Sequence, residues 1–121
     1  MSKTIHLSIG VHSISDSVNF FTTTLNGRIT HQEETYTNID LFGLQLTLKP
    51  GMKVTAGLTD FHFGFNMSLT EFDEFAEKIV SEHSQFVQME PQVVDGGTPM
   101  ERKKMYLKSP SGYLIELKGY K

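Results

Sequence analysis

The sequence predicts an α+β fold made of two βαβββ modules in tandem. Two stretches, 6–11 and 62–67, each begin with His and then alternate large apolar with small or polar side chains. Each stretch is followed by a helix signal and then by three further strand patterns. The 121 residues are expected to form a single domain, with modules at 1–50 and 60–121 and a connector at 51–59.

The first strand and the helix of each module carry the clearest signals. Residues 4–11 and 61–67 alternate strictly, which is typical of half-buried strands. Ser13 and Ser68 each begin a helix, because an acidic residue three positions later completes a capping box. The first helix is expected to end at Asn26-Gly27, and the second has apolar residues at helical spacing.

The remaining strands are predicted from alternating patterns bounded by turn residues. In the first module they are an exposed polar strand and a hairpin that turns at Gly43. In the second module they are a strand interrupted by Pro91 and a hairpin around Pro110-Ser111-Gly112. These strands are expected at residues 28–36, 38–42, 44–49, 85–94, 103–108 and 113–119.

Composition and charge exclude several classes of protein. There is no cysteine, which excludes disulfides and thiol nucleophiles. The net charge of −3 argues against a general nucleic-acid binder. No apolar run approaches the length of a membrane span, and the first residues enter a strand pattern without the apolar core of a signal peptide. We therefore expect a cytoplasmic protein that binds neither membranes nor nucleic acids.

Four mid-strand residues share one description: each lies on the strand face opposite the apolar side chains. They are His6, Gln45, His62 and Glu116. A carboxylate within a short apolar strand must be paired or bound to a metal if that face is buried. In a duplicated sheet, equivalent strands face each other across a pseudo-twofold axis, so equivalent positions should converge. Two imidazoles, a carboxylate and an amide oxygen suit a divalent metal ion.

The neighbours of these four residues on the same face are small or polar, which leaves room for a substrate. The substrate-binding candidates are Ser8, Thr47 and Asn66. The alternative is that the two histidines are ordinary surface residues, since a strand histidine taken alone is usually exposed or hydrogen-bonded. The joint match of strand face, repeat position and chemistry favours the metal site.

The chain resembles the vicinal oxygen chelate superfamily, which includes glyoxalase I, extradiol dioxygenases, and fosfomycin and bleomycin resistance proteins. The resemblance covers nearly the whole sequence and is carried by residues 6–11 with the helix ending at Leu25-Asn26-Gly27, and by 44–46, 62–64 and 109–116. It implies modules whose strands curl into a cup-like mixed sheet around one metal ion, with helices on the outer face.

The resemblance also implies which residues bind the metal. Ligands in this superfamily come from the first and fourth strands of each module, which correspond here to His6, Gln45, His62 and Glu116. Gln45 is then a fourth ligand, a hydrogen-bond donor behind the ligands, or a bystander. The implied cofactor is one divalent ion: Ni, Zn, Mn, Co or Fe.

One local motif is similar to that of extradiol dioxygenases. A tyrosine, Tyr106, precedes a turn with Pro and Gly and then the ligand Glu116, which suggests a catalytic role for Tyr106. The alternative is that Tyr106 is a sheet aromatic. The histidine that assists ring cleavage in those enzymes has no counterpart before Met105, where residues 97–99 are Gly-Thr-Pro.

The implied chemistry is chelation of a small-molecule substrate through two neighbouring oxygens. We favour a glyoxalase-type lyase or isomerase in which Glu116 is both ligand and base. One alternative is an extradiol dioxygenase that uses His6, His62 and Glu116. Another is an antibiotic-binding or antibiotic-modifying resistance protein. A homodimer is expected, with the metal site formed within one chain or between two.

Overall fold

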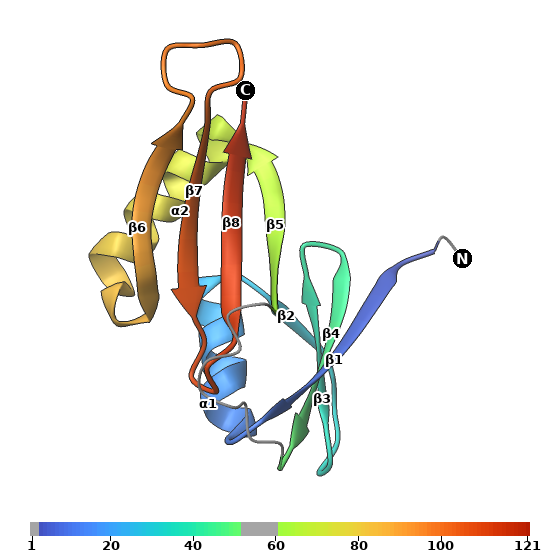
Figure 1. The fold of residues 1–121 in the computed structure, drawn as a ribbon. Helices are drawn as coiled ribbons and strands as arrows, with labels where there is room; N and C mark the ends of the chain where they lie inside the picture. Colours follow the sequence, from blue (N-terminus) through green and yellow to red (C-terminus); the bar gives the residue numbers. More distant parts are fainter. Residues whose placement is uncertain (1–2, 52–60) are drawn as a thin grey trace. The chain divides into compact units, whose positions relative to one another are not determined.

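The computed structural model describes residues 3–51 and 61–121, and it confirms the predicted α+β class with two βαβββ modules (Figure 1). Most of the predicted connector lies outside the described residues. The described chain divides into two compact units. The first contains the residues up to Gly51 together with Pro110–Gly112, and the second contains the rest from Phe61 onward. The curling of the modules into one cup stays a prediction.

Each unit holds one four-stranded mixed sheet. The strand orders are β1-β4-β3-β2 and β5-β8-β7-β6, and in each sheet the first and last strands of the module pair in parallel. The short helix η1 is a π-helix and η2 is a 3-10 helix. The elements are β1 (Ile5–Val11), α1 (Ile14–Asn19), η1 (Phe20–Thr24), β2 (Arg28–Gln32), β3 (Thr37–Leu41), β4 (Leu44–Pro50), β5 (His62–Ser68), α2 (Leu69–Glu82), η2 (Ser84–Phe86), β6 (Val87–Val94), β7 (Arg102–Lys108) and β8 (Leu114–Tyr120).

In the first unit, apolar side chains on one face of the sheet are buried together with those of the helical segment. α1 contacts β3 and β4, and Phe20, Phe21 and Leu25 are fully buried. The strands contribute Ile9, Val11, Ile39, Leu41, Leu46 and Leu48. Ile5 at the start of β1 is 74% exposed, so only the later part of the predicted apolar face of this strand is buried.

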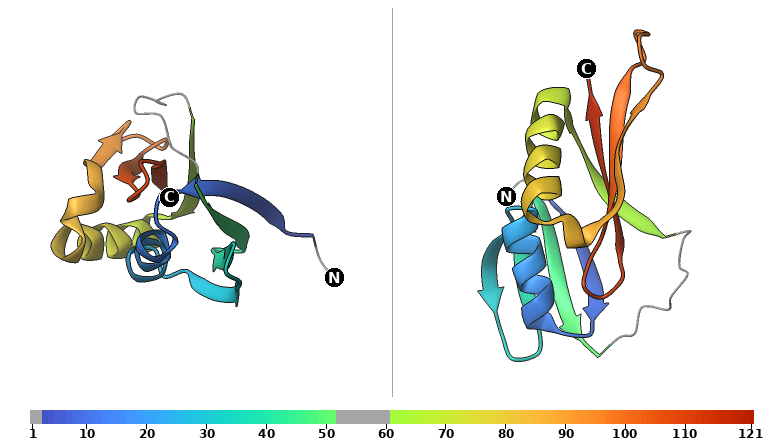
Figure 2. Two further views of the ribbon diagram at one scale, coloured as in Figure 1. Left: turned by 90° about the horizontal axis from the view of Figure 1, so that it is seen from below. Right: turned by 90° about the vertical axis from the view of Figure 1, so that its left-hand side faces the viewer.

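In the second unit, α2 lies along one face of the sheet and contacts all four of its strands (Figure 2). Ser68 caps the helix as predicted: its hydroxyl accepts a hydrogen bond from the backbone N–H of Glu71 at 3.2 Å. Phe72 and Ile79 are fully buried. Gly119 on β8 makes room for the helix, because a Cβ atom there would lie 2.6 Å from Cβ of Phe72. The other face of this sheet therefore remains free of the helix.

The first helix differs from the single regular helix that was predicted. It begins with Ser13 as N-cap but becomes a π-helix after Asn19. The hydroxyls of Thr22 and Thr23 donate to the carbonyl oxygens of Val18 and Asn19 at 2.7 and 2.6 Å. Such hydrogen bonds by β-branched residues compete with the regular backbone ladder, and the capping signals do not reveal them.

Two strands also differ from their predicted extent. The exposed strand predicted at 28–36 is shorter, Arg28–Gln32. Pro91 does not interrupt β6, which runs from Val87 to Val94 at the edge of its sheet. An edge strand tolerates a residue without an N–H group, and the pairing of β6 with β7 shifts register on both sides of Met89. None of the helices in the described part of the chain is long and apolar enough to cross a membrane.

The cap of α2 provides a test of the second unit. Replacing Ser68 by Ala removes the acceptor of the Glu71 N–H, and we expect the free energy of unfolding to fall by about 1 kcal/mol. Urea denaturation measures this change. Ser81→Ala is the matched control, because the Ser81 hydroxyl only donates to the Lys78 carbonyl near the end of the same helix. Equal losses in the two variants would contradict a specific capping role.

Candidate functional site

The polar face of the second sheet carries a buried carboxylate, Glu116. The strand register places Gly64 of β5 opposite Glu116 on one side and Tyr106 of β7 opposite it on the other. The side chain of Glu116 is only 8% exposed. Burying a carboxylate is costly unless its charge is compensated by neighbouring groups, so its surroundings define the candidate site.

Three side chains from this face surround the carboxylate. Nε2 of His62 and Nζ of Lys118 each lie 3.5 Å from Oε1 of Glu116. The ring of Tyr106 stands edge-on to the imidazole of His62, with centroids 5.9 Å apart and an interplanar angle of 88°. His62, Glu116, Lys118 and Asn66 line a hollow of about 220 Å³.

The phenol of Tyr106 is held in its neutral form. Desolvation raises the pKa of Tyr106 above its usual value of 10.0, and a hydrogen bond with Glu116 and the charge of that carboxylate raise it further. A neutral phenol next to a carboxylate is a hydrogen-bond donor. The predicted catalytic pair, Glu116 and Tyr106, is thus in direct interaction within one unit.

Gly64 is required by the close approach of the two parallel strands. A Cβ atom on Gly64 would overlap the carbonyl oxygen of Glu116 and lie 2.8 Å from its carbonyl carbon. No side chain therefore projects from β5 directly opposite Glu116. The carboxylate instead meets His62, which lies one side-chain repeat before Gly64 on the same face.

The first unit brings together the other two predicted ligands. His6 of β1 and Gln45 of β4 are direct partners in the parallel pair, and both are exposed. Ser8 and Thr47 are the next pair on the same face. Thr47 is buried, and its hydroxyl donates to Oδ1 of Asn38 at 2.7 Å.

The registers of the two sheets correct the alignment of the internal repeat. The sequence suggests that Gln45 and Glu116 occupy equivalent positions. In the structure Gln45 pairs with His6, whereas Leu114 pairs with His62. Glu116 lies two residues beyond Leu114, so its counterpart in the first module is Thr47. Strand alternation allows a shift by two residues without changing the face, and for this reason the sequence does not reveal it.

Comparison with known protein families identifies the family to which the chain belongs. The model of the glyoxalase/bleomycin resistance protein/dioxygenase superfamily matches residues 3–117. The chain belongs to this superfamily. No curated protein sequence shows significant similarity to the chain.

Solved structures of several proteins share the fold of this chain at low sequence identity. A glyoxalase/bleomycin resistance protein/dioxygenase from Alicyclobacillus acidocaldarius has a TM-score of 0.81 and 20% identity, covering 98% of this chain and 91% of that one. The fosfomycin resistance protein FosX from Listeria monocytogenes, in complex with Mn(II) and sulfate, has a TM-score of 0.75 and 16% identity over 100% and 94% of the two chains. TioX from Micromonospora sp. ML1 has a TM-score of 0.73 and 9% identity over 99% and 100%.

Each unit contributes two of the four ligands that the superfamily resemblance implies. His62 and Glu116 lie together in the second unit, and His6 and Gln45 are strand partners in the first. Neither unit brings three His, Asp or Glu side chains close enough to hold a metal ion among its described residues.

The sequence reasoning missed two lysines on the polar face of the second sheet. Lys118 contacts Glu116, and Lys104 lies directly opposite Lys118 in the antiparallel pair of β7 and β8. Lys118 is two residues after Glu116, so strand alternation alone places it on the same face. Pairing it with Lys104 required the register of the last hairpin.

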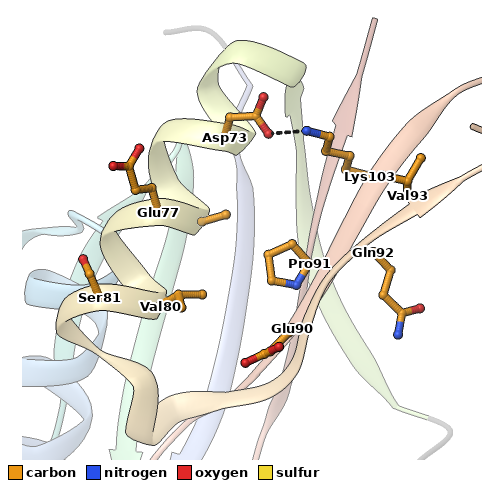
Figure 3. A pocket seen from close by; sticks show the side chains of 10 residues that line it. Asp73, Glu77, Val80, Ser81, Glu90, Pro91, Gln92, Val93 and Lys103 are labelled. Carbon is orange, nitrogen blue, oxygen red and sulfur yellow. Dashed lines mark hydrogen bonds and ion pairs between the residues drawn. The ribbon is translucent and has the colours of Figure 1, made fainter.

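A larger pocket of about 600 Å³ lies on the helix side of the second sheet, between α2 and β6 (Figure 3). Asp73 of α2 and Lys103 of β7 form an ion pair of 2.7 Å at its edge. Its walls include the carboxylates of Glu77 and Glu90 as well as Asp73, but no histidine. This pocket lacks the imidazole that accompanies the buried carboxylate on the opposite face, which remains the candidate site.

The raised pKa of Tyr106 predicts a specific dependence on pH. Above about pH 10 the unfolded chain ionises its tyrosines while folded Tyr106 stays protonated. Stability contributed by Tyr106 is therefore present at lower pH and is lost as the pH rises through its raised pKa. In an absorbance titration of tyrosinate, Tyr106→Phe should remove the component that ionises at the highest pH. Tyr120→Phe is the control and should leave that component in place. If the component disappears in Tyr120→Phe and not in Tyr106→Phe, its assignment to Tyr106 is refuted.

Proposed function

We propose that this protein is a divalent-metal-dependent enzyme that chelates a small-molecule substrate through two neighbouring oxygens. Within this class we favour a glyoxalase-type lyase or isomerase. The observation that carries the proposal is the buried carboxylate of Glu116, which lies 3.5 Å from Nε2 of His62 and opposite Tyr106. A carboxylate and an imidazole that lie side by side are two suitable metal ligands. The carboxylate is also a proton acceptor, and the imidazole is a possible donor next to it.

The residues present fit a divalent ion. Imidazole and carboxylate are among its usual ligands, and His62 and Glu116 present both within one hollow. In our proposal His6 completes the set, with the Gln45 amide as the fourth ligand. The superfamily neighbour FosX has been solved with Mn(II), which supports a divalent ion; the candidates are Ni, Zn, Mn, Co and Fe. The ion would act as a Lewis acid that stabilises negative charge developing on the chelated oxygens.

The protein residues supply the proton transfer. Glu116 accepts a proton from the substrate carbon next to a chelated oxygen and returns it to the neighbouring carbon, so that no redox partner is needed. Tyr106 stays neutral and donates a hydrogen bond to Glu116, which orients the carboxylate. Asn66 and Lys118 line the same hollow and present polar groups to the substrate. Ser8 and Thr47 are the proposed substrate contacts of the first unit.

Ring cleavage by the dioxygenase route is less well supported by the residues present. The stretch where dioxygenases carry their assisting histidine is here an exposed turn at residues 97–99, Gly-Thr-Pro. Isomerisation needs only a proton acceptor, a ligand set and an orienting donor, and Glu116, His62 and Tyr106 fit these roles. This difference is the reason for placing the lyase or isomerase first.

Metal binding is the first test of the proposal. Mn(II), Ni(II) and Zn(II) titrated by calorimetry should bind with one ion per site, and His62→Ala and Glu116→Gln should each weaken binding at least about tenfold. Gln45→Ala tests the fourth ligand and should also weaken metal binding, whereas Thr47→Ala, which alters a proposed substrate contact, should change it little. His83→Ala, at the end of α2, is the matched control.

Binding that is unchanged in His62→Ala and Glu116→Gln would contradict the metal site. The same samples test the homodimer, which we also propose: light scattering should give twice the chain mass of 13.7 kDa. A mass of one chain with full metal binding would place all the ligands in one chain and refute the dimer.

Turnover tests the reaction class. With the metal bound, hemithioacetals of 2-oxoaldehydes should be converted under anaerobic conditions, and Glu116→Gln should lower kcat by about a hundredfold or more. Tyr106→Phe should lower kcat less, because it removes an orienting hydrogen bond and leaves the base in place. Lys108→Gln, which alters the end of β7, is the control. Oxygen uptake with catechols, or turnover of fosfomycin in place of hemithioacetals, would overturn the favoured class.

A further inference from the structure

We infer that Lys104 and Lys118 form an anion-binding site beside Glu116, which takes a carboxylate, phosphate or phosphonate group of the substrate. The anion site itself follows from the charges on the polar face of the second sheet. Its assignment to the substrate rests on the proposed function, because it places the anionic group next to the reacting oxygens.

The two lysines face each other across the last hairpin. Lys104 of β7 and Lys118 of β8 are direct partners in the antiparallel register. Partners of this kind have Cβ atoms about 4.5–5.5 Å apart and share one face of the sheet, and like charges in this arrangement repel each other. An ion of opposite charge between the two ammonium groups would relieve this repulsion.

The fold supplies too little negative charge for these lysines. Glu116 contacts Lys118 at 3.5 Å, but the same oxygen also lies 3.5 Å from His62. Lys104 has no ion pair with any residue in the described parts of the chain.

The other carboxylates of this unit that are close to basic groups are already engaged. Asp95 pairs with Arg102 at 2.7 Å, and Asp73 pairs with Lys103 on the helix side of the sheet. Glu101 lies 3.7 Å from Nζ of Lys121 and also accepts a hydrogen bond from the backbone N–H of Gly97. None of them is available to Lys104.

The space between the lysines is suited to a small anion. Lys104, Lys118, Arg102 and Glu116 line a hollow of about 140 Å³, together with Val94 and Lys103. A water molecule occupies roughly 30 Å³ in the liquid, so the hollow accepts a carboxylate or phosphonate group with ordered water. Glu116 and Lys118 also line the hollow that contains His62. A single ligand molecule can therefore occupy both hollows.

Glu116 competes with the anion for Lys118. Any cation bound by the carboxylate, or any substitution that removes its charge, leaves Lys118 without its present partner. The affinity for an anion should then increase. A general effect of net charge would be the same for every carboxylate, so Glu77→Gln on the helix side of the sheet should leave the affinity nearly unchanged.

The test uses the full-length protein, freed of metal with a chelator and then dialysed. Methylphosphonate is titrated in, and the chemical shifts of backbone amides are followed by ¹⁵N NMR. We expect a saturable change centred on Lys104 and Lys118. Lys104→Gln and Lys118→Gln should each raise the dissociation constant about fivefold, as expected for loss of one close charge contact. Glu116→Gln should lower it by a similar factor.

Lys108→Gln is the matched control, since it removes the same charge from the same face of β7 and should change the dissociation constant less than twofold. Equal effects of Lys104→Gln and Lys108→Gln, no saturation, or weaker binding in Glu116→Gln would each overturn the anion site. Thermal unfolding of every variant verifies the fold. The titration is done without metal, so the two proposals can fail separately. Failure of metal binding would refute the proposed function but not the anion site. Failure of methylphosphonate binding would refute the anion site but not the proposed function.

Discussion

The buried carboxylate of Glu116 is the constraint on which the polar face of the second unit depends. An isolated charge in a low-dielectric setting is costly, so its neighbours must offset that cost. His62 and Lys118 approach one oxygen, and Tyr106 donates a hydrogen bond to the carboxylate. Gly64 is fixed separately, by the backbone, because any side chain there would collide with the main-chain carbonyl of Glu116. The buried charge thus accounts for the partners His62, Tyr106 and Lys118, and the close approach of β5 to β8 accounts for Gly64.

The two modules treat equivalent positions differently. By register, the counterpart of Glu116 in the first module is Thr47, a neutral group whose hydroxyl is satisfied by Asn38 at 2.7 Å. A neutral hydroxyl needs one hydrogen-bond partner, whereas a carboxylate needs several compensating groups. The first unit accordingly leaves His6 and Gln45 exposed and without a buried charge between them. The two modules share their strand pattern and a polar sheet face, and in the second module that face carries the buried charge of Glu116.

The sequence predicted the features that depend on local residue patterns, which are the strands and the helix starts. It did not predict the features that depend on the register between paired strands. Alternation identified the strands and the faces that carry His6, His62 and Glu116, and the capping box identified the start of α2. The π-helix arose from threonine hydroxyls that bond to the carbonyls four residues earlier, an option that capping signals do not reveal. Thr47 as the counterpart of Glu116, and Lys104 as the partner of Lys118, required the register, because a shift of two residues preserves every alternation.

Positions where local rules are broken without a gain in packing often mark function. Two lysines placed opposite each other weaken the pairing of β7 with β8, and a buried carboxylate weakens the packing of β8. Each feature taken alone is unfavourable for the fold. Taken together, they place a carboxylate and two cations on one face of the sheet, next to an imidazole. Such an arrangement suits a molecule that carries an anionic group close to a pair of chelating oxygens, and its binding would relieve both kinds of strain at once.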